Sequence, residues 1–203
     1  MTQPSQQASL SLQNSGKSGT QISRSILRKQ LLDARRASSA EDRTQWDRQL
    51  GQQVIAWCER YQISSLGVFW PIQAEPDLRD CYARLQQMQV QLALPLVLAK
   101  DKPLQFLSWT PGDLMVQDDY GIPVPAQRAK LSQPEALLIP CVGFNSANYR
   151  LGYGGGFYDR TLALLPRPKT LGIAYALAQT EFAVELHDVA LDFVLTEKMA
   201  GNF

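Results

Sequence analysis

The stretch that most constrains the fold runs from Arg150 to Arg160 and reads Arg-Leu-Gly-Tyr-Gly-Gly-Gly-Phe-Tyr-Asp-Arg. Glycine lacks a Cβ and adopts positive φ readily, so this density predicts an irregular loop with accessible backbone N–H groups. The apolar run 136–139 before it is typical of a buried strand, and residues 158–165 after it predict a helix. A strand, a glycine loop and a helix in this order favour phosphate binding.

The two common phosphate motifs are absent. The third glycine of a dinucleotide fingerprint would fall on Phe157, and the Gly16-Lys17-Ser18 segment has Ser11 where a P-loop begins with glycine. A mobile surface linker is the alternative for the glycine stretch. Flexible linkers usually combine glycine with serine, whereas this one is interleaved with Tyr153 and Tyr158, which favours a ligand wall.

At this point the chain resembles a known family. Arg150–Arg160 is similar to the signature of 5-formyltetrahydrofolate cyclo-ligases, also called methenyltetrahydrofolate synthetases, and the resemblance extends from about Ser23 to the C-terminus. It implies conversion of 5-formyltetrahydrofolate to 5,10-methenyltetrahydrofolate, with ATP as co-substrate and Mg²⁺ as cofactor. Two other classes stay open: a non-catalytic folate- or nucleotide-binding module, and an enzyme like the sugar-phosphate isomerases or CoA-transferases.

Composition indicates the class of protein and the cell compartment to expect. A chain of 203 residues with 45% hydrophobic content suits one domain with a sizeable core. The net charge of +1 predicts no nucleic-acid partner, and no apolar run long enough to span a membrane occurs. Three widely spaced cysteines argue against a disulfide framework, so we expect a cytoplasmic protein. We also expect a monomer with a small-molecule folate as partner.

The chain divides into a tail and one domain. Residues 1–21 are rich in Gln, Ser and Gly, so we expect a disordered tail before a domain at 22–203. Alternating helices and short apolar strands predict an α/β fold with a mostly parallel sheet. The resemblance implies a three-layer α/β/α sandwich. Helices are expected at 22–37, after a capping box at 38–41, and at 78–88, and strands at 66–70, 90–94, 104–109, 136–139, 170–175 and 193–196.

The first residues expected to bind the nucleotide are Arg24 and Arg28, which are four residues apart and therefore share one helix face. On their own they are typical of a solvated basic face, but the resemblance implies contacts to the nucleotide phosphates, which suit the planar guanidinium fork. The ATP-binding residues implied in full are Arg24, Arg28, Arg150, Leu151, Gly152, Tyr153, Gly154, Gly155, Gly156, Phe157 and Tyr158.

The main residue expected to bind the folate is Glu75, in the loop that follows strand 66–70. The resemblance implies that its carboxylate accepts hydrogen bonds from the pterin N–H groups, which an ionised carboxylate can do. Trp70 is implied as a wall of the same pocket, and the alternative for it is a core aromatic. The remaining substrate contacts implied are Tyr153, Gly154, Gly155, Gly156 and Phe157.

Asp159 and Asp188 are the carboxylates that the resemblance implies for Mg²⁺, which prefers carboxylates combined with phosphate oxygens. The alternatives are a helix cap for Asp159 and a surface turn for Asp188. Asp159 and Asp188 could meet if strand 193–196 pairs near residues 137–139, because the loop before that strand could then reach the glycine loop.

Four positions depart from the family pattern. At one of them, Asn148 stands where glycine is common, and asparagine tolerates the left-handed conformation that the turn needs. Leu96 stands where a basic residue is common, and Lys100 or Lys102 could supply that charge instead. Cys141 replaces a usual glycine, and we expect a buried small residue there. Asn145 replaces an aspartate, which indicates a structural role for that position.

Overall fold

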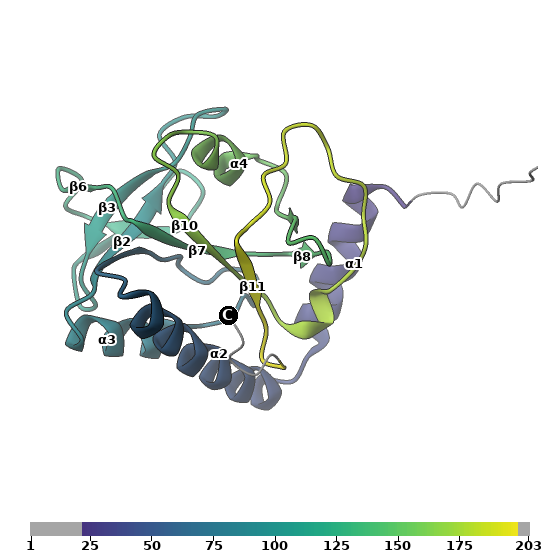
Figure 1. Cartoon of the computed structure of the whole chain (residues 1–203), viewed down its shortest axis with the longest axis horizontal. Helices are drawn as coiled ribbons and strands as arrows, with labels where there is room; N and C mark the ends of the chain where they lie inside the picture. Colours follow the sequence, from purple (N-terminus) through teal and green to yellow (C-terminus); the bar gives the residue numbers. More distant parts are fainter. Residues whose placement is uncertain (1–21, 199–203) are drawn as a thin grey trace, which may run out of the picture.

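The computed structural model describes residues 22–198, so the predicted disordered tail at 1–21 lies outside the described residues, as do 199–203. Figure 1 shows helices packed around a central sheet. The helices are α1 (Arg24–Ala37), α2 (Ala40–Tyr61), α3 (Arg79–Gln87), α4 (Phe157–Leu162) and a short 3₁₀ turn η1 (Ala176–Ala178). The strands are β1 (Ser65–Gly67), β2 (Gln91–Leu96), β3 (Gln105–Trp109), β4 (Met115–Gln117), β5 (Pro123–Pro125), β6 (Leu131–Ser132), β7 (Ala136–Pro140), β8 (Gly143–Phe144), β9 (Arg150–Leu151), β10 (Lys169–Ile173) and β11 (Phe193–Leu195).

The central sheet has seven strands in the order β11-β10-β7-β1-β2-β3-β6. Its first five strands pair in parallel, and β3 pairs antiparallel with both β2 and β6. The predicted α/β fold with a mostly parallel sheet is therefore confirmed. The expected pairing of 193–196 with 137–139 is wrong, because β10 lies between β11 and β7 and pairs with both.

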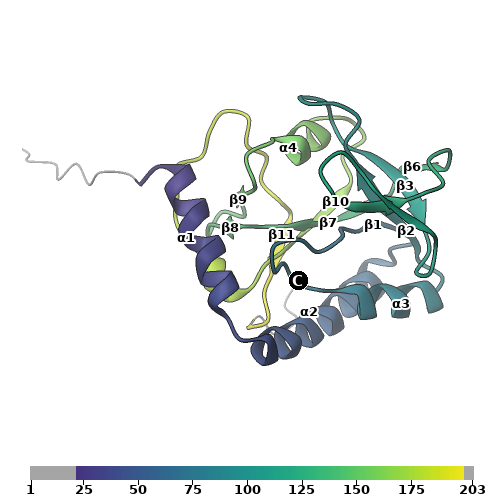
Figure 2. The same ribbon diagram turned by 180° about the vertical axis from the view of Figure 1, so that it is seen from behind.

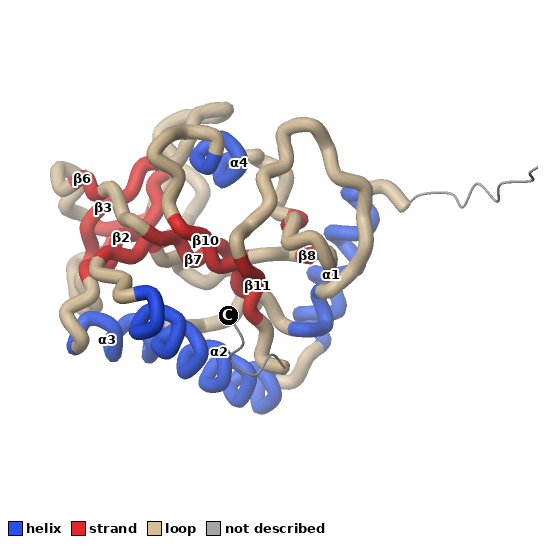
Figure 3. Tube along the Cα trace, in the orientation of Figure 1, coloured by secondary structure: helices blue, strands red, loops and turns tan. Residues whose placement is uncertain are grey.

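The two faces of the sheet bury different side chains. Leu138 points into one core with Trp57 of α2, whereas its neighbours Leu137 and Ile139 point into a second core with Leu162 of α4. This alternation is the period of two that a strand buried on both faces requires. Figures 1 and 3 show α2 and α3 under one face and α4 over the other. Three layers are therefore present, and loops complete the layer of α4.

Helix α1 lies at the side of the sheet, next to the β8–β9 hairpin (Figure 2). Leu31 of α1 packs there against Val142 and Leu151 in a small separate core. Because Leu151 begins the glycine stretch, this contact places the helix face that carries the arginines beside the glycine loop. None of the helices between residues 22 and 198 has the length and apolarity that crossing a membrane requires.

Element ends differ from the prediction by a few residues. The cap of α2 is Ser39, whose hydroxyl accepts from the backbone N–H of Asp42 at 3.0 Å, one residue later than the predicted capping box. Strand β1 ends at Gly67, three residues before the predicted end at residue 70. Helix α4 runs from Phe157 to Leu162 rather than over residues 158–165.

Candidate active site

The glycine loop joins β9 to α4 and takes backbone conformations that require glycine. Gly154 has φ of 97° and Gly156 has φ of 64°, both in the left-handed region. A Cβ at Gly154 would lie 3.6 Å from the guanidinium carbon of Arg28, and one at Gly156 would lie 2.9 Å from Nη1 of Arg160. The predicted irregular glycine loop is confirmed, and two arginines line it.

Those arginines bind the carbonyl groups of the loop. Nε of Arg28 donates to the carbonyl of Gly152 at 2.7 Å, and the guanidinium of Arg160 donates to the carbonyl of Gly155. Arg160 also lies over the ring of Phe157, with its guanidinium carbon 5.3 Å from the ring centroid. Burial, together with the neighbouring Arg24, lowers the pKa of the Arg28 guanidinium. These cations suit an anionic ligand.

Arg24 and Arg150, the other predicted nucleotide arginines, form ion pairs. Arg24 bonds Asp188 at 2.5 Å and Glu185 at 3.1 Å, both from the loop before β11. Arg150 is buried, where it bonds Asp159 at 2.9 Å and donates to the carbonyl of Val189 at 3.2 Å. The structure thus pairs each of these two arginines with one of the two predicted magnesium carboxylates.

The two predicted magnesium carboxylates come from segments that touch. Oδ1 of Asp159 accepts a hydrogen bond at 3.2 Å from the backbone N–H of Val189, the residue after Asp188. Within residues 22–198 no group of three or more His, Cys, Asp or Glu side chains could hold a metal on its own. Mg²⁺ commonly uses one or two carboxylates plus substrate phosphates, so this pair suits an ion held jointly with a nucleotide.

Glu75 lies in the loop between β1 and α3, and only 4% of its surface is exposed. Oε2 accepts from the backbone N–H of Ile72 at 2.9 Å, and Oε1 accepts from the Tyr153 hydroxyl at 2.8 Å. Burial raises the pKa of Glu75 to about 7, although both hydrogen bonds and nearby Arg35 oppose that rise. The hydrogen bond from Tyr153 joins the predicted folate carboxylate directly to the glycine loop.

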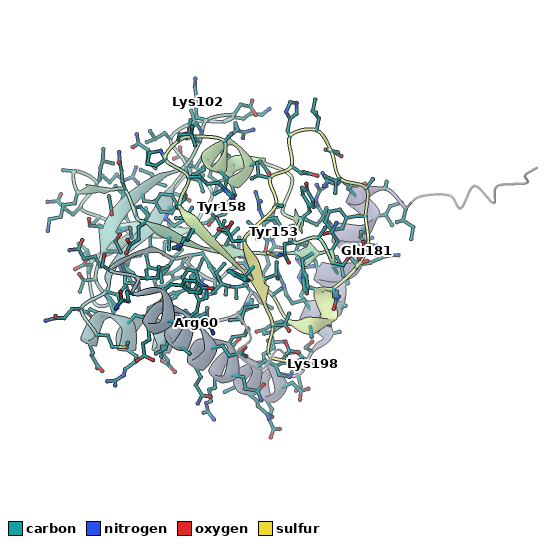
Figure 4. The ribbon with its side chains drawn as sticks, viewed as in Figure 1. Arg60, Lys102, Tyr153, Tyr158, Glu181 and Lys198 are labelled. Carbon is teal, nitrogen blue, oxygen red and sulfur yellow. The ribbon has the colours of Figure 1, made fainter. Side chains whose placement is uncertain are left out.

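Arg35, in the last turn of α1, belongs to this site although the sequence analysis did not select it. Its side chain is buried, with Nη2 donating to the Tyr153 hydroxyl at 2.7 Å and Nε donating to the carbonyl of Gln73 at 3.1 Å. The spacing could have indicated it, because Arg28 and Arg35 are seven residues apart and therefore share a helix face. Tyr153 lies in the middle of Figure 4.

Trp70 and Glu75 line a cavity of about 370 Å³. The guanidinium of Arg79 lies 5.4 Å from the Trp70 ring centroid, and Trp109 meets Trp70 edge-on at 6.1 Å. Trp70 therefore lines this cavity and also packs against the aromatic core, and its contact with the folate stays a prediction. The other described residues around this cavity come from α2, residues 71–79 and Tyr175.

The remaining predicted site residues divide between core and loop. Leu151 is buried in the small core beside α1, and Tyr158 packs against the second core of the sheet. Phe157 is half-buried and meets the Tyr120 ring at 6.2 Å. The contact of Leu151 and Tyr158 with ATP stays a prediction, and in this structure both side chains anchor the loop.

The departures from the family pattern have structural roles where the prediction expected them. Cys141 is 1% exposed, as expected of a buried small residue. Oδ1 of Asn145 accepts from the backbone N–H groups of Ala147 and Tyr149, which confirms a structural role. Asn148 holds φ of 61° in the same turn, and Leu96 is buried.

Comparison with known proteins decides the family. Residues 20–197 match the sequence model of the 5-formyltetrahydrofolate cyclo-ligase family. The chain belongs to the 5-formyltetrahydrofolate cyclo-ligase family. It is therefore an enzyme of the ligase class, as the resemblance implied.

Relatives in this family align over nearly their whole length. The 5-formyltetrahydrofolate cyclo-ligase of Mycoplasma pneumoniae is 29% identical over 87% of this chain and 100% of its own length. That of Escherichia coli K12 is 28% identical over 80% of this chain and 93% of its own. Among solved structures, a 5,10-methenyltetrahydrofolate synthetase from Mycoplasma pneumoniae superimposes with a TM-score of 0.73 at 27% identity, covering 87% of this chain and 100% of that one. The Aquifex aeolicus synthetase gives 0.70 at 27% identity, covering 87% and 90%.

Proposed function

We propose that this chain converts 5-formyltetrahydrofolate and MgATP to 5,10-methenyltetrahydrofolate, ADP and phosphate. The observation that carries the proposal is the 2.8 Å hydrogen bond between Tyr153 and Glu75. It joins the glycine loop expected to hold ATP to the carboxylate expected to hold the folate. Two substrates that exchange a phosphoryl group must meet, and this contact supports two binding sites that lie side by side.

The chemistry needs orientation more than a protein nucleophile. The formyl oxygen attacks the γ-phosphorus of ATP, the bond to ADP breaks, and an iminium phosphate forms. N10 of the folate then attacks the formyl carbon and loses its proton to solvent. The bond from this carbon to oxygen breaks, so the ring closes and phosphate leaves carrying the former formyl oxygen. Positioning and charge neutralisation carry phosphoryl transfer of this kind.

Residues of this chain supply each requirement. Arg28 and the glycine loop would bind the nucleotide phosphates, and Arg24 and Arg150 would bind them after exchanging their carboxylate partners. Glu75 would accept hydrogen bonds from the pterin N–H groups and so orient the formyl group toward the loop.

Asp159 and Asp188 would hold Mg²⁺, which supplies neutralisation of phosphate charge when bound. Asp159→Asn and Asp188→Asn should each raise the magnesium concentration needed for half-maximal rate. Asp33→Asn, on the exposed face of α1, is the matched control. A magnesium requirement equal in all four proteins would remove the two aspartates from the proposal.

The reaction itself is tested with the purified chain, 5-formyltetrahydrofolate, ATP and Mg²⁺. The absorbance of the methenyl product should rise only when all four components are present, with one ADP formed for each product molecule. No ATP-dependent product would refute the proposal, and binding of both ligands without turnover would indicate a binding module instead. A cytoplasmic location belongs to the same proposal, since Cys58, Cys81 and Cys141 are free thiols.

A further inference from the structure

We infer that Arg35 is a positioning residue that acts through the Tyr153 hydroxyl to hold the Glu75 carboxylate oriented and ionised toward the folate. The identity of the ligand in this inference rests on the proposed function. The role of Arg35 rests on the contacts of three segments that are distant in sequence: the last turn of α1, the glycine loop, and the loop between β1 and α3.

The hydroxyl of Tyr153 lies between a cation and a carboxylate. Nη2 of Arg35 donates to this oxygen at 2.7 Å, and the oxygen donates its single hydrogen to Oε1 of Glu75 at 2.8 Å. A hydroxyl has one donor hydrogen and two acceptor lone pairs, so the arginine fixes the direction of the donated hydrogen. Chains of this kind polarise one another, which strengthens the bond to the carboxylate.

Arg35 also holds the backbone that carries Glu75. Its Nε donates to the carbonyl of Gln73 at 3.1 Å. Gln73 and Ala74 have φ of 47° and 58°, left-handed conformations that residues with a Cβ seldom adopt. The backbone N–H of Glu75 closes this turn on the carbonyl of Ile72 at 2.9 Å. One guanidinium therefore fixes both the turn and, through Tyr153, the carboxylate at its end.

The charges around Glu75 make Arg35 important for its ionisation. Burial raises the pKa of Glu75 to about 7, and Arg35 is the cation that lowers it. The other titratable groups whose charge interacts with Glu75 are Tyr153, Tyr82 from α3, Tyr158 from α4 and Cys141 after β7. Burial raises the pKa of each of these four groups, so all are uncharged near pH 7. Removing Arg35 should therefore move Glu75 ionisation to higher pH.

The test is the pH dependence of 5-formyltetrahydrofolate binding, measured without ATP by quenching of tryptophan fluorescence. Binding to the wild type should strengthen as pH rises through the ionisation of Glu75. In Arg35→Met the midpoint should move up by about one pH unit, which weakens binding about fivefold at pH 7. The apparent KM for ATP in the turnover assay should change less than that for the folate, because Arg35 meets the expected ATP-binding stretch only through the Tyr153 hydroxyl.

Two further variants separate the positioning role from a general effect of charge or folding. Arg36→Met removes one positive charge from the residue next to Arg35. Arg36 donates a hydrogen bond to the Gln73 side chain at 2.6 Å and does not contact Tyr153. The midpoint of this variant should match the wild type. Tyr153→Phe leaves Arg35 in place and removes the bridging oxygen, so it should raise the midpoint even if Arg35→Met does not fold. The double variant should be no worse than Arg35→Met alone.

Three results would overturn the role of Arg35: an unmoved midpoint in Arg35→Met, an equal shift in Arg36→Met, or effects of Arg35→Met and Tyr153→Phe that simply add. An active wild type with any of these results refutes the inference and leaves the proposed reaction standing. A wild type that binds folate without turnover, combined with the expected shift, refutes the reaction and supports Arg35. A wild type without folate binding refutes both.

Discussion

Two loops of the candidate site reach left-handed backbone conformations by different means. The glycine loop uses residues without a Cβ, Gly154 and Gly156, at its two left-handed positions. The loop before Glu75 uses Gln73 and Ala74, which cost about 1–2 kcal/mol each in that conformation. The conformation of the first loop follows from its glycine content, whereas the conformation of the second depends on hydrogen bonds from residues that are distant in sequence. Adding a Cβ at a left-handed position of the first loop should therefore destabilise the protein, whereas removing one from the second loop should not.

The largest expected effect concerns the acid at the end of the second loop. Burial raises the pKa of Glu75 from 4.5 to about 7, so the folded protein keeps a proton that the unfolded chain has released between these values. The free energy of unfolding should therefore fall by about 3 kcal/mol as pH rises across this window, and level off above it.

Glu75→Gln should lose this pH dependence, which urea denaturation at several pH values measures. Burial also raises the pKa of Asp47, to about 6, but this carboxyl titrates in both proteins and cancels from the difference. Equal pH slopes in wild type and variant would show that Glu75 ionises as freely in the fold as outside it.

The next largest effect tests whether each of the two loops binds a different substrate. Arg28→Ala removes a charge-assisted contact expected with phosphate, worth about 1.5–3 kcal/mol, so the apparent KM for ATP should rise by roughly ten- to a hundredfold. Arg150→Ala should act in the same direction and Arg24→Ala more weakly, whereas Glu75→Gln should raise the KM for the folate instead. Steady-state kinetics with each substrate varied in turn measure this. An unchanged ATP saturation in all three arginine variants would place the nucleotide elsewhere.

A smaller effect tests the glycine loop alone. Gly154→Ala forces a Cβ into φ of 97°, so the free energy of unfolding should fall by about 1–2 kcal/mol. Gly152→Ala is the matched control, because a Cβ there meets nothing within 4 Å and its φ is not left-handed. Thermal and urea denaturation compare the two. Equal stability of both variants would mean that the loop does not need glycine at position 154.

The smallest effect has the opposite sign and belongs to the second loop. Ala74→Gly relieves a left-handed alanine at φ of 58°, so it should leave the protein equally stable or more stable by up to about 1 kcal/mol. The same substitution at Ala83, within α3, should cost about 1 kcal/mol. Denaturation of both variants decides whether the second loop is strained, and equal losses would show that it is not.

The same contrast explains what the sequence could predict. The sheet, its core strands and the glycine loop follow from local patterns, and so does the turn in which Asn145 and Asn148 stand. Arg35 was missed because its seven-residue spacing from Arg28 indicates only a shared helix face, and its partners Gln73 and Tyr153 lie 38 and 118 residues away. The position of β10 between β7 and β11 could not be predicted either. The order of strands in a sheet depends on the connections between them, and the apolar runs of the sequence do not specify those connections.

The central claim is that the two loops bring both substrates together so that a phosphoryl group passes between them. The most direct measurement follows ¹⁸O placed in the formyl group of 5-formyltetrahydrofolate during turnover with unlabelled ATP. The account predicts that each phosphate released carries the labelled oxygen. Unlabelled phosphate would contradict it, because the phosphoryl group would then have passed to water rather than to the folate.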